Sequence, residues 1–233
     1  MSQAGSRVLH IEGNAGRLAI LADSPAGPAK GVAVIAHPQP LMGGSPRHKV
    51  PHHLARAVCG IGFEVLRPSF RGVGSSEGQY DNGIGETEDM LNVVQFVRHL
   101  HPGLPLALIG FSFGAYVMSR VVSRLAEAGQ PADITALLAL PVGDTSEGRY
   151  YDTKPVPRDT LIVHGENDSN ARLAALLDWA RPVRHPIVVM PGSDHFFSGS
   201  LDTVVSIVLK ELRLCLGRSD IGCTTARKMI NHD

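Results

Sequence analysis

The 233-residue sequence has few cysteines, few aromatic residues and no excess of charge of either sign. Its three cysteines, Cys59, Cys215 and Cys223, are widely spaced and odd in number. This spacing argues against a disulfide framework and favours a reducing, cytoplasmic location. Lys plus Arg and Asp plus Glu number 22 each, so no net charge favours nucleic acid as a partner.

Long apolar runs are also missing from the chain. The longest, 104–111 and 134–140, have the length of strands, whereas a bilayer span needs roughly 18 apolar residues. Residues 1–7 are polar and lack the apolar core of a signal peptide. We therefore expect no membrane partner.

Short apolar runs alternate with amphipathic segments along most of the chain. Runs 8–11 and 17–22 flank a glycine-bounded turn and predict an antiparallel hairpin. Further strands are expected at 31–36, 63–70, 104–111, 134–140, 160–164 and 187–190. Helices are expected at 49–60, 86–100, 113–128, 170–180 and 201–216. This alternation predicts one α/β domain over residues 1–216, with a mostly parallel sheet and helices on both faces. Residues 217–233 are polar and aperiodic and are expected to form a tail.

Residues 110–114 read Gly-Phe-Ser-Phe-Gly and match the pattern G-x-S-x-G. Ser112 falls between an expected strand and an expected helix, which is the setting of a nucleophile elbow. The start of a helix also favours the negative charge that develops during attack. The alternative is that Ser112 only caps the helix. We predict that Ser112 is a nucleophile.

A serine hydroxyl needs a general base, and the base needs an acid that orients it. Asp168 follows the expected strand 160–164, and His195 follows the expected strand 187–190. The carboxyl ends of parallel strands meet at one edge of a sheet, so these residues are expected to lie near Ser112. The sequence predicts His195 as the base and Asp168 as the acid, with Glu166 as the alternative acid.

Four segments resemble the α/β-hydrolase superfamily: the loop 37–44 (HPQPLMGG), the glycine-rich turn 71–76, the Ser112 elbow, and the loops with Asp168 and His195. The resemblance covers residues 6–216. The chain is similar to small bacterial hydrolases that have no lid domain. These are related to dienelactone hydrolases and to the catalytic domains of X-Pro dipeptidyl-peptidase-like enzymes. Dienelactone hydrolases use a cysteine nucleophile, whereas this chain has Ser112. The resemblance implies a single-domain α/β-hydrolase fold and acyl-transfer chemistry.

The resemblance also implies an oxyanion hole, in which two N–H groups bind the negatively charged oxygen of the tetrahedral intermediate. The residue after the nucleophile, Phe113, supplies one backbone N–H. By similarity to the usual turn after the first parallel strand of the family, Gln39 supplies the second. Pro38 and Pro40 have no N–H to donate, and Leu41 is the alternative donor.

Several other polar residues stand in the loops at this expected edge. His37 is expected to orient its loop, and Arg71 is expected to pair with a carboxylate, for which Asp89 is a candidate. His48 and His52 have the spacing of metal ligands, but no acidic residue or cysteine stands nearby in the sequence. We therefore expect no metal and no cofactor.

Fewer than two dozen residues separate the expected strands 134–140 and 160–164, which leaves room for a loop but not for a lid. Arg149, Tyr150 and Tyr151 in this loop are expected to shape a substrate pocket. We predict a serine carboxylesterase that acts on small soluble esters or thioesters through an acyl-enzyme. The alternatives are a serine peptidase of the dipeptidyl-peptidase-like type and a non-catalytic homologue used for binding. The chain is expected to be a monomer or a homodimer.

Overall fold

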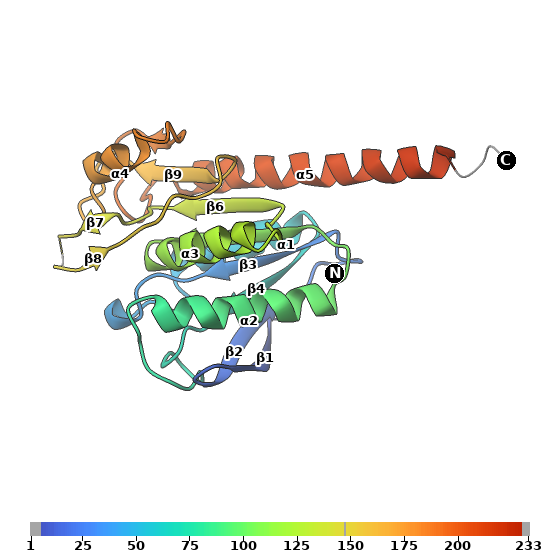
Figure 1. The fold of residues 1–233 in the computed structure, drawn as a ribbon, viewed down its shortest axis with the longest axis horizontal. Coiled ribbons are helices and arrows are strands. Elements are labelled where there is room, and N and C mark those ends of the chain that lie inside the picture. The colour runs from blue at the N-terminus through green and yellow to red at the C-terminus, as the bar shows by residue number, and fades with distance from the viewer. Residues whose placement is uncertain (1–5, 147, 230–233) are drawn as a thin grey trace.

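The computed structural model describes residues 6–146 and 148–229, with side chains up to Gly217. An eight-stranded sheet lies at its centre, in the order β1-β2-β4-β3-β5-β6-β9-β10 (Figure 1). The strands of this sheet are β1 (Arg7–Gly13), β2 (Gly16–Asp23), β3 (Gly31–Ala36), β4 (Phe63–Pro68), β5 (Leu106–Phe111), β6 (Ile134–Leu138), β9 (Leu161–Gly165) and β10 (Val188–Met190). All neighbours from β4 to β10 pair in parallel, and β1 and β2 add an antiparallel hairpin at one edge.

Helices cover both faces of the sheet. The helices are α1 (Lys49–Gly60), α2 (Ile84–Leu100), α3 (Phe113–Glu127), α4 (Leu173–Ala180) and α5 (Leu201–Met229), with a short 3-10 helix, η1 (Pro40–Met42). Helices α2 and α3 pack on one face, and α1 and α5 pack on the other. The predicted α/β architecture is thereby confirmed. No helix in the described part of the chain is both long enough and apolar enough to cross a bilayer.

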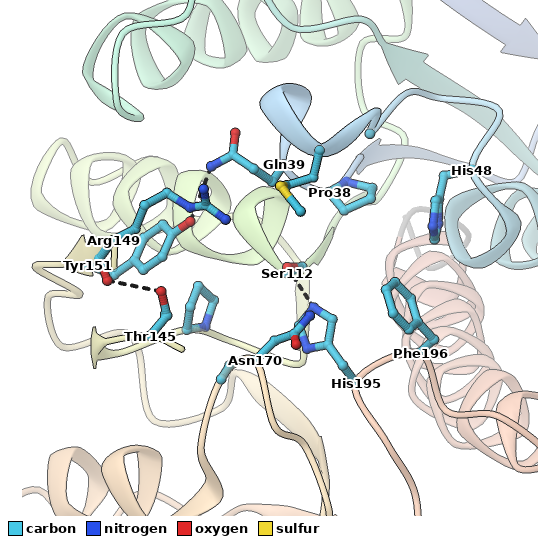
Figure 2. A pocket seen from close by; sticks show the side chains of 14 residues that line it. Pro38, Gln39, His48, Ser112, Thr145, Arg149, Tyr151, Asn170, His195 and Phe196 are labelled. Carbon is cyan, nitrogen blue, oxygen red and sulfur yellow. Dashed lines mark hydrogen bonds between the residues drawn. The ribbon is translucent and has the colours of Figure 1, made fainter. Parts of the chain in front are cut away.

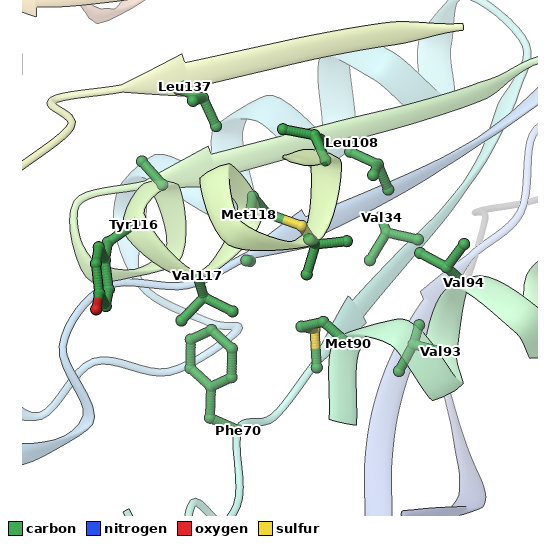
Figure 3. Packing of buried hydrophobic residues seen from close by; sticks show 14 of the residues in the cluster. Val34, Phe70, Met90, Val93, Val94, Leu108, Tyr116, Val117, Met118 and Leu137 are labelled. Carbon is green, nitrogen blue, oxygen red and sulfur yellow. The ribbon is translucent and has the colours of Figure 1, made fainter. Parts of the chain in front are cut away.

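Alternate residues of β3 enter two different cores. Val32 and Val34 pack against α2 and α3, whereas Ala33 and Ile35 pack against α1 and α5. Figure 3 shows the first core, where Val34 lies close to Leu108 and Met118. Successive side chains of a strand point to opposite faces, so a strand covered on both faces must be apolar throughout. This requirement explains the uninterrupted apolar runs in the sequence.

The structure differs from the sequence-based expectation at several boundaries. The strand expected at 134–140 ends at Leu138, because Ala139 turns the chain with a φ of 50°. The strand expected at 63–70 ends at Pro68. Two short strands, β7 (Gly143–Asp144) and β8 (Tyr150–Tyr151), were not expected. Each has two residues, which is too few to produce a periodic signal.

The helix expected to end at residue 216 continues to Met229 in α5, and its far end extends beyond the sheet (Figure 1). The segment 217–229 of the expected polar tail is therefore helical, although its sequence shows no clear periodicity. No proline interrupts this segment, which contains two glycines, Gly217 and Gly222. A glycine costs a helix only about 1 kcal/mol. Residues 230–233 lie outside the described part of the chain.

Candidate active site

The carboxyl ends of β5, β9 and β10 bring the predicted site residues to one edge of the sheet. Ser112 stands between β5 and α3, Asp168 follows β9, and His195 follows β10. Strand β6 lies between β5 and β9 in the sheet. The loop after β9 therefore has to reach back toward Ser112, as does the loop after β10.

Ser112 occupies a sharp turn with a φ of 56° and a ψ of −123°. This conformation is uncommon for a residue with a side chain, and it persists only where neighbouring structure enforces it. A Cβ atom on Gly110 would lie 2.4 Å from the carbonyl oxygen of Gly114, and one on Gly114 would lie 2.4 Å from that of Ala36. Both glycines of the G-x-S-x-G pattern are thus required by close backbone contacts.

The structure brings Ser112, His195 and Asp168 into one hydrogen-bonded chain. The Oγ of Ser112 lies 2.9 Å from Nε2 of His195, and Nδ1 of His195 lies 2.7 Å from Oδ2 of Asp168. The other carboxylate oxygen of Asp168 accepts the backbone N–H groups of Asn170 and Ala171 at 2.9 and 2.8 Å. A carboxylate held in this way orients the imidazole so that its Nε2 faces the serine hydroxyl.

The alternative acid, Glu166, points elsewhere. Its Oε2 accepts the backbone N–H of Gly192 at 2.7 Å, so it braces the start of the loop that carries His195. Asp194 in the same loop accepts the N–H groups of Phe196 and Ser198, and the hydrogen bonds from Ser198 lower the pKa of the Asp194 carboxyl.

A second histidine, His164, lies beneath the loop that carries Asp168. It is fully buried, and its Nε2 donates to the carbonyl oxygen of Ala171 at 2.7 Å. The same nitrogen lies 3.5 Å from Oδ2 of Asp168. Burial lowers the pKa of His164, so its ring stays neutral at neutral pH. His164 supports the acid-bearing loop and makes no contact of this kind with Ser112.

His37, at the end of β3, connects two loops. Its Nδ1 donates to the carbonyl oxygen of Pro38 at 2.8 Å, and its Nε2 accepts the backbone N–H of Phe70 at 3.1 Å. Burial lowers the pKa of His37 to about 3, because a charged ring would be removed from water without a negative partner. These contacts agree with the expected loop-orienting role.

Of the two predicted oxyanion donors, one follows Ser112 in the chain and the other lines the same cavity. Phe113 is the first residue of α3, where backbone N–H groups have no acceptor within the helix. Gln39 lines the same cavity as Ser112, and its carbonyl oxygen accepts the N–H groups of Met42 and Gly44. Leu41, the alternative donor, directs its own N–H to the side-chain oxygen of Gln39 at 3.4 Å. Its N–H is therefore engaged within the turn.

A cavity of about 330 Å³ opens above Ser112 (Figure 2). The loop between β6 and β9 contributes Thr145, Arg149 and Tyr151 to its lining. Tyr150, in contrast, points away and is 69% exposed. Two of the three residues expected to shape a pocket therefore do so, and pairing between β7 and β8 holds their loop in place.

The opposite wall of the cavity is aromatic. The ring of His48 lies 5.8 Å from that of Phe111 and 5.7 Å from that of Phe196. Burial and the nearby His195 lower the pKa of His48, burial having the larger effect. The motifs had not identified Phe196 or Asn170 as lining residues. Their only sequence signal is their position beside His195 and Asp168.

The remaining polar residues at this edge of the sheet form ion pairs, cap a helix or lie beside other polar side chains. The guanidinium of Arg71 binds both carboxylate oxygens of Asp89, at 2.7 and 2.9 Å, as expected from the sequence. His48 caps α1 by accepting the N–H of Val50, whereas His52 lies beside Arg67. Within the described residues, no group of three or more potential ligands is placed to hold a metal ion.

Comparison with known proteins gives several matches. A family model described as the alpha/beta hydrolase fold matches residues 33–136. A solved structure from Xanthomonas campestris, described as an α/β serine hydrolase without a lid, is 31% identical with a TM-score of 0.78, and the match covers 91% of this chain and 96% of that chain. An α/β serine hydrolase homologue from Coxiella burnetii is 32% identical with a TM-score of 0.76, over 91% of this chain and 100% of that chain. An uncharacterized protein of Rickettsia prowazekii is 30% identical over 199 residues, 81% of each chain.

Proposed function

The chain belongs to the α/β-hydrolase family of serine hydrolases without a lid, and we propose that it is a carboxylesterase acting on small esters or thioesters. The observation that carries this proposal is the hydrogen-bonded chain from Ser112 through His195 to Asp168 at the floor of a cavity. The cavity volume of about 330 Å³ is at the lower end of the range for small-molecule sites, which favours a small substrate.

In the proposed mechanism, Oγ of Ser112 attacks the carbonyl carbon of the ester while Nε2 of His195 takes its proton. Asp168 stabilises the imidazolium that forms. The backbone N–H groups of Phe113 and Gln39 bind the oxyanion of the tetrahedral intermediate. The intermediate then collapses, the bond to the leaving group breaks, and His195 gives its proton to the departing alcohol or thiol.

The second half of the reaction releases the acid. A water molecule loses a proton to His195 and attacks the carbonyl carbon of the acyl-enzyme. A second tetrahedral intermediate forms in the same oxyanion hole. When it collapses, the bond from the carbonyl carbon to Ser112 breaks, and the serine recovers its proton from His195.

A fluorophosphonate probe tests whether Ser112 is an activated nucleophile. We expect the wild type to be labelled and Ser112→Ala to remain unlabelled. An unlabelled wild type, or equal labelling of the two proteins, would refute the proposal.

A substrate panel tests the reaction class. It contains p-nitrophenyl esters of increasing acyl length, acyl thioesters and aminoacyl amides. We expect turnover of the short esters or thioesters. A clear preference for the amides would replace the esterase proposal with a peptidase.

A further inference from the structure

The side chain of Gln39 is held at three points. It is buried at the cavity, directly before the short helix η1. Its Oε1 accepts the backbone N–H of Leu41 at 3.4 Å, and its Nε2 donates to the hydroxyl oxygens of Tyr80 and Tyr151, each at 3.2 Å. The two hydrogens of an amide nitrogen match these two acceptors. Because a backbone N–H can only donate, the contact with Leu41 also fixes which end of the amide is the oxygen.

The three partners of this arrangement come from separate parts of the chain. Gln39 follows β3, Tyr80 precedes α2, and Tyr151 belongs to β8 in the loop between β6 and β9. Figure 2 shows the Gln39 amide hydrogen-bonded to Tyr151 on one side of Ser112. Segments that lie 41 and 112 residues further along the sequence thus converge on one amide.

Each tyrosine is itself held by its own loop. The fully buried Glu86 accepts the backbone N–H of Asp81 at 2.8 Å, which fixes the chain directly after Tyr80. Tyr151 pairs with Gly143 between β8 and β7. The two hydroxyl groups that receive the Gln39 amide therefore stand on anchored backbone.

The same tyrosines pack against the other proposed oxyanion donor. The ring of Phe113 lies 5.4 Å from that of Tyr80 and 6.4 Å from that of Tyr151. Phe113 is fully buried. The two tyrosines therefore contact both residues whose backbone N–H groups are proposed to bind the oxyanion.

Anchoring the Gln39 side chain restrains its backbone. Pro38 and Pro40 restrict the chain on either side of Gln39, since the proline ring fixes φ. The N–H of Gln39 lies in the peptide plane that joins it to Pro38, and a held side chain limits rotation of that plane. An N–H that is already oriented needs no rearrangement during the reaction, and this is the source of the catalytic effect of an oxyanion hole.

We propose that Tyr80 and Tyr151 are positioning residues of the oxyanion hole and that they act through the side-chain amide of Gln39. They keep the backbone N–H of Gln39 in the orientation that binds the oxyanion. The loop between β6 and β9 thereby contributes to turnover as well as to the cavity wall. This inference rests on the proposed esterase function and adds two residues to its machinery.

Steady-state hydrolysis of p-nitrophenyl acetate by tyrosine variants tests the inference. Tyr80→Phe is the most direct probe, because Tyr80 is not among the described residues that line the cavity and cannot act by touching the substrate. We expect each of Tyr80→Phe and Tyr151→Phe to lower kcat by about 3- to 10-fold, and the double variant by about 10- to 50-fold, since removal of a whole oxyanion donor costs on the order of 10²- to 10³-fold. The values of kcat and kcat/KM should fall together, as they do when an interaction made only in the transition state is lost.

Tyr116→Phe is the matched control. The ring of Tyr116 lies 4.9 Å from that of Tyr151 in the same aromatic cluster, and within the described part of the chain its hydroxyl makes no hydrogen bond to Gln39. This variant should keep the wild-type kcat. A loss equal to that of Tyr80→Phe would overturn the inference, because any hydroxyl in the cluster would then have the same effect.

Gln39→Met shows whether the tyrosines act through the amide. Methionine is similar in length to glutamine, keeps the backbone N–H and removes the amide. We expect kcat to fall about as far as in the double tyrosine variant, and Tyr80→Phe to have little further effect in this background, because the effects of residues that act through one group do not add. If Tyr80→Phe costs the same factor in Gln39→Met as in the wild type, the inference is wrong.

A pair of inhibitors shows whether the loss concerns the oxyanion. In 1,1,1-trifluorohexan-2-one the Oγ of Ser112 adds to the carbonyl carbon, the serine proton passes to His195, and the carbonyl oxygen becomes an oxyanion. Hexan-2-one lacks the fluorines and adds far less readily. In the double tyrosine variant, the Ki of the trifluoro ketone should rise by the factor by which kcat/KM falls, while the Ki of hexan-2-one stays unchanged. Equal weakening of both ketones, or of neither, contradicts the inference.

The outcomes separate the inference from the proposed function. A wild type that turns over esters, together with an unchanged kcat in the double tyrosine variant, overturns the inference and leaves the esterase proposal standing. Absence of turnover and of probe labelling in the wild type overturns both. Should Gln39→Met fail to fold, the two ketones decide the question with the tyrosine variants, which keep every ring. A loss confined to the trifluoro ketone then supports the inference, and its absence refutes it.

Discussion

Two buried histidines follow strands of the same sheet, and their hydrogen-bond partners separate their roles. His37, after β3, is bonded to the backbone carbonyl of Pro38 and the backbone N–H of Phe70. His195, after β10, is bonded to the side chains of Asp168 and Ser112. The exposed fractions are similar, 0% and 6%. Burial alone therefore does not distinguish a structural imidazole from one that can transfer protons.

The difference lies in what each ring could gain by taking a proton. A charged His37 would meet backbone groups that are already satisfied by the neutral ring, and burial lowers its pKa to about 3. A charged His195 would lie 2.7 Å from the carboxylate oxygen of Asp168, which stabilises an imidazolium. A carboxylate on one side and a hydroxyl on the other make a histidine suitable for catalysis. The predictions below test this contrast.

The largest expected effect is the loss of turnover when the imidazole of His195 is removed. His195→Ala and Ser112→Ala should each lower kcat by on the order of 10⁴- to 10⁶-fold, because the residues act as one unit and the loss of either removes most of its effect. Steady-state hydrolysis of p-nitrophenyl acetate measures this loss. A His195→Ala variant with near-normal turnover would refute the assignment of the base.

The orienting acid should come next in size. Asp168→Asn should lower kcat by on the order of 10⁴-fold, because an amide cannot hold the imidazole in the required tautomer. Glu166→Gln is the matched control from the same loop and should retain turnover close to that of the wild type. If kcat falls to a similar extent in the two variants, the loss comes from a change in the loop structure and not from removal of the Asp168 carboxylate.

Removal of the His37 imidazole should lower the stability of the folded protein. His37→Ala leaves the N–H of Phe70 without its acceptor and opens a void, so the free energy of unfolding should fall by about 2–4 kcal/mol. Urea unfolding followed by circular dichroism measures this change. His53→Ala removes a histidine whose side chain is 45% exposed and should have a smaller effect. If the two variants are equally stable, His37 is not the structural element that we describe.

A further, gradual effect is the pH dependence of stability. The pKa of His37 is about 3 in the folded protein and near 6.5 in the unfolded chain, so the unfolded state binds the extra proton as the pH falls. Stability from this group is full above pH 6.5 and declines toward pH 3, by up to about 1.4 kcal/mol per pH unit. Urea midpoints between pH 6.5 and 4.5 should therefore fall less steeply in His37→Ala than in the wild type. An unchanged slope would contradict this assignment.

The sequence alone determined the architecture and the three residues of the hydrogen-bonded chain. Apolar runs and amphipathic segments are local patterns, and a sheet covered on both faces requires them. Gly110 and Gly114 were visible in the sequence as part of the G-x-S-x-G pattern, and the backbone contacts in the structure explain why both are glycine. Since parallel strands end at one edge, the order of Ser112, Asp168 and His195 along the chain was sufficient to predict that they meet.

Only the tertiary structure decided which way each loop residue points. Asp168 and Glu166 are two residues apart, and their different N–H partners direct one carboxylate to His195 and the other to Gly192. Tyr150 and Arg149 are adjacent, yet one is exposed and the other lines the cavity. Loops have no repeating pattern, so contacts between distant segments determine these directions. Ser112 could therefore be proposed as the nucleophile from its motif, whereas the directions of the loop side chains could not be predicted.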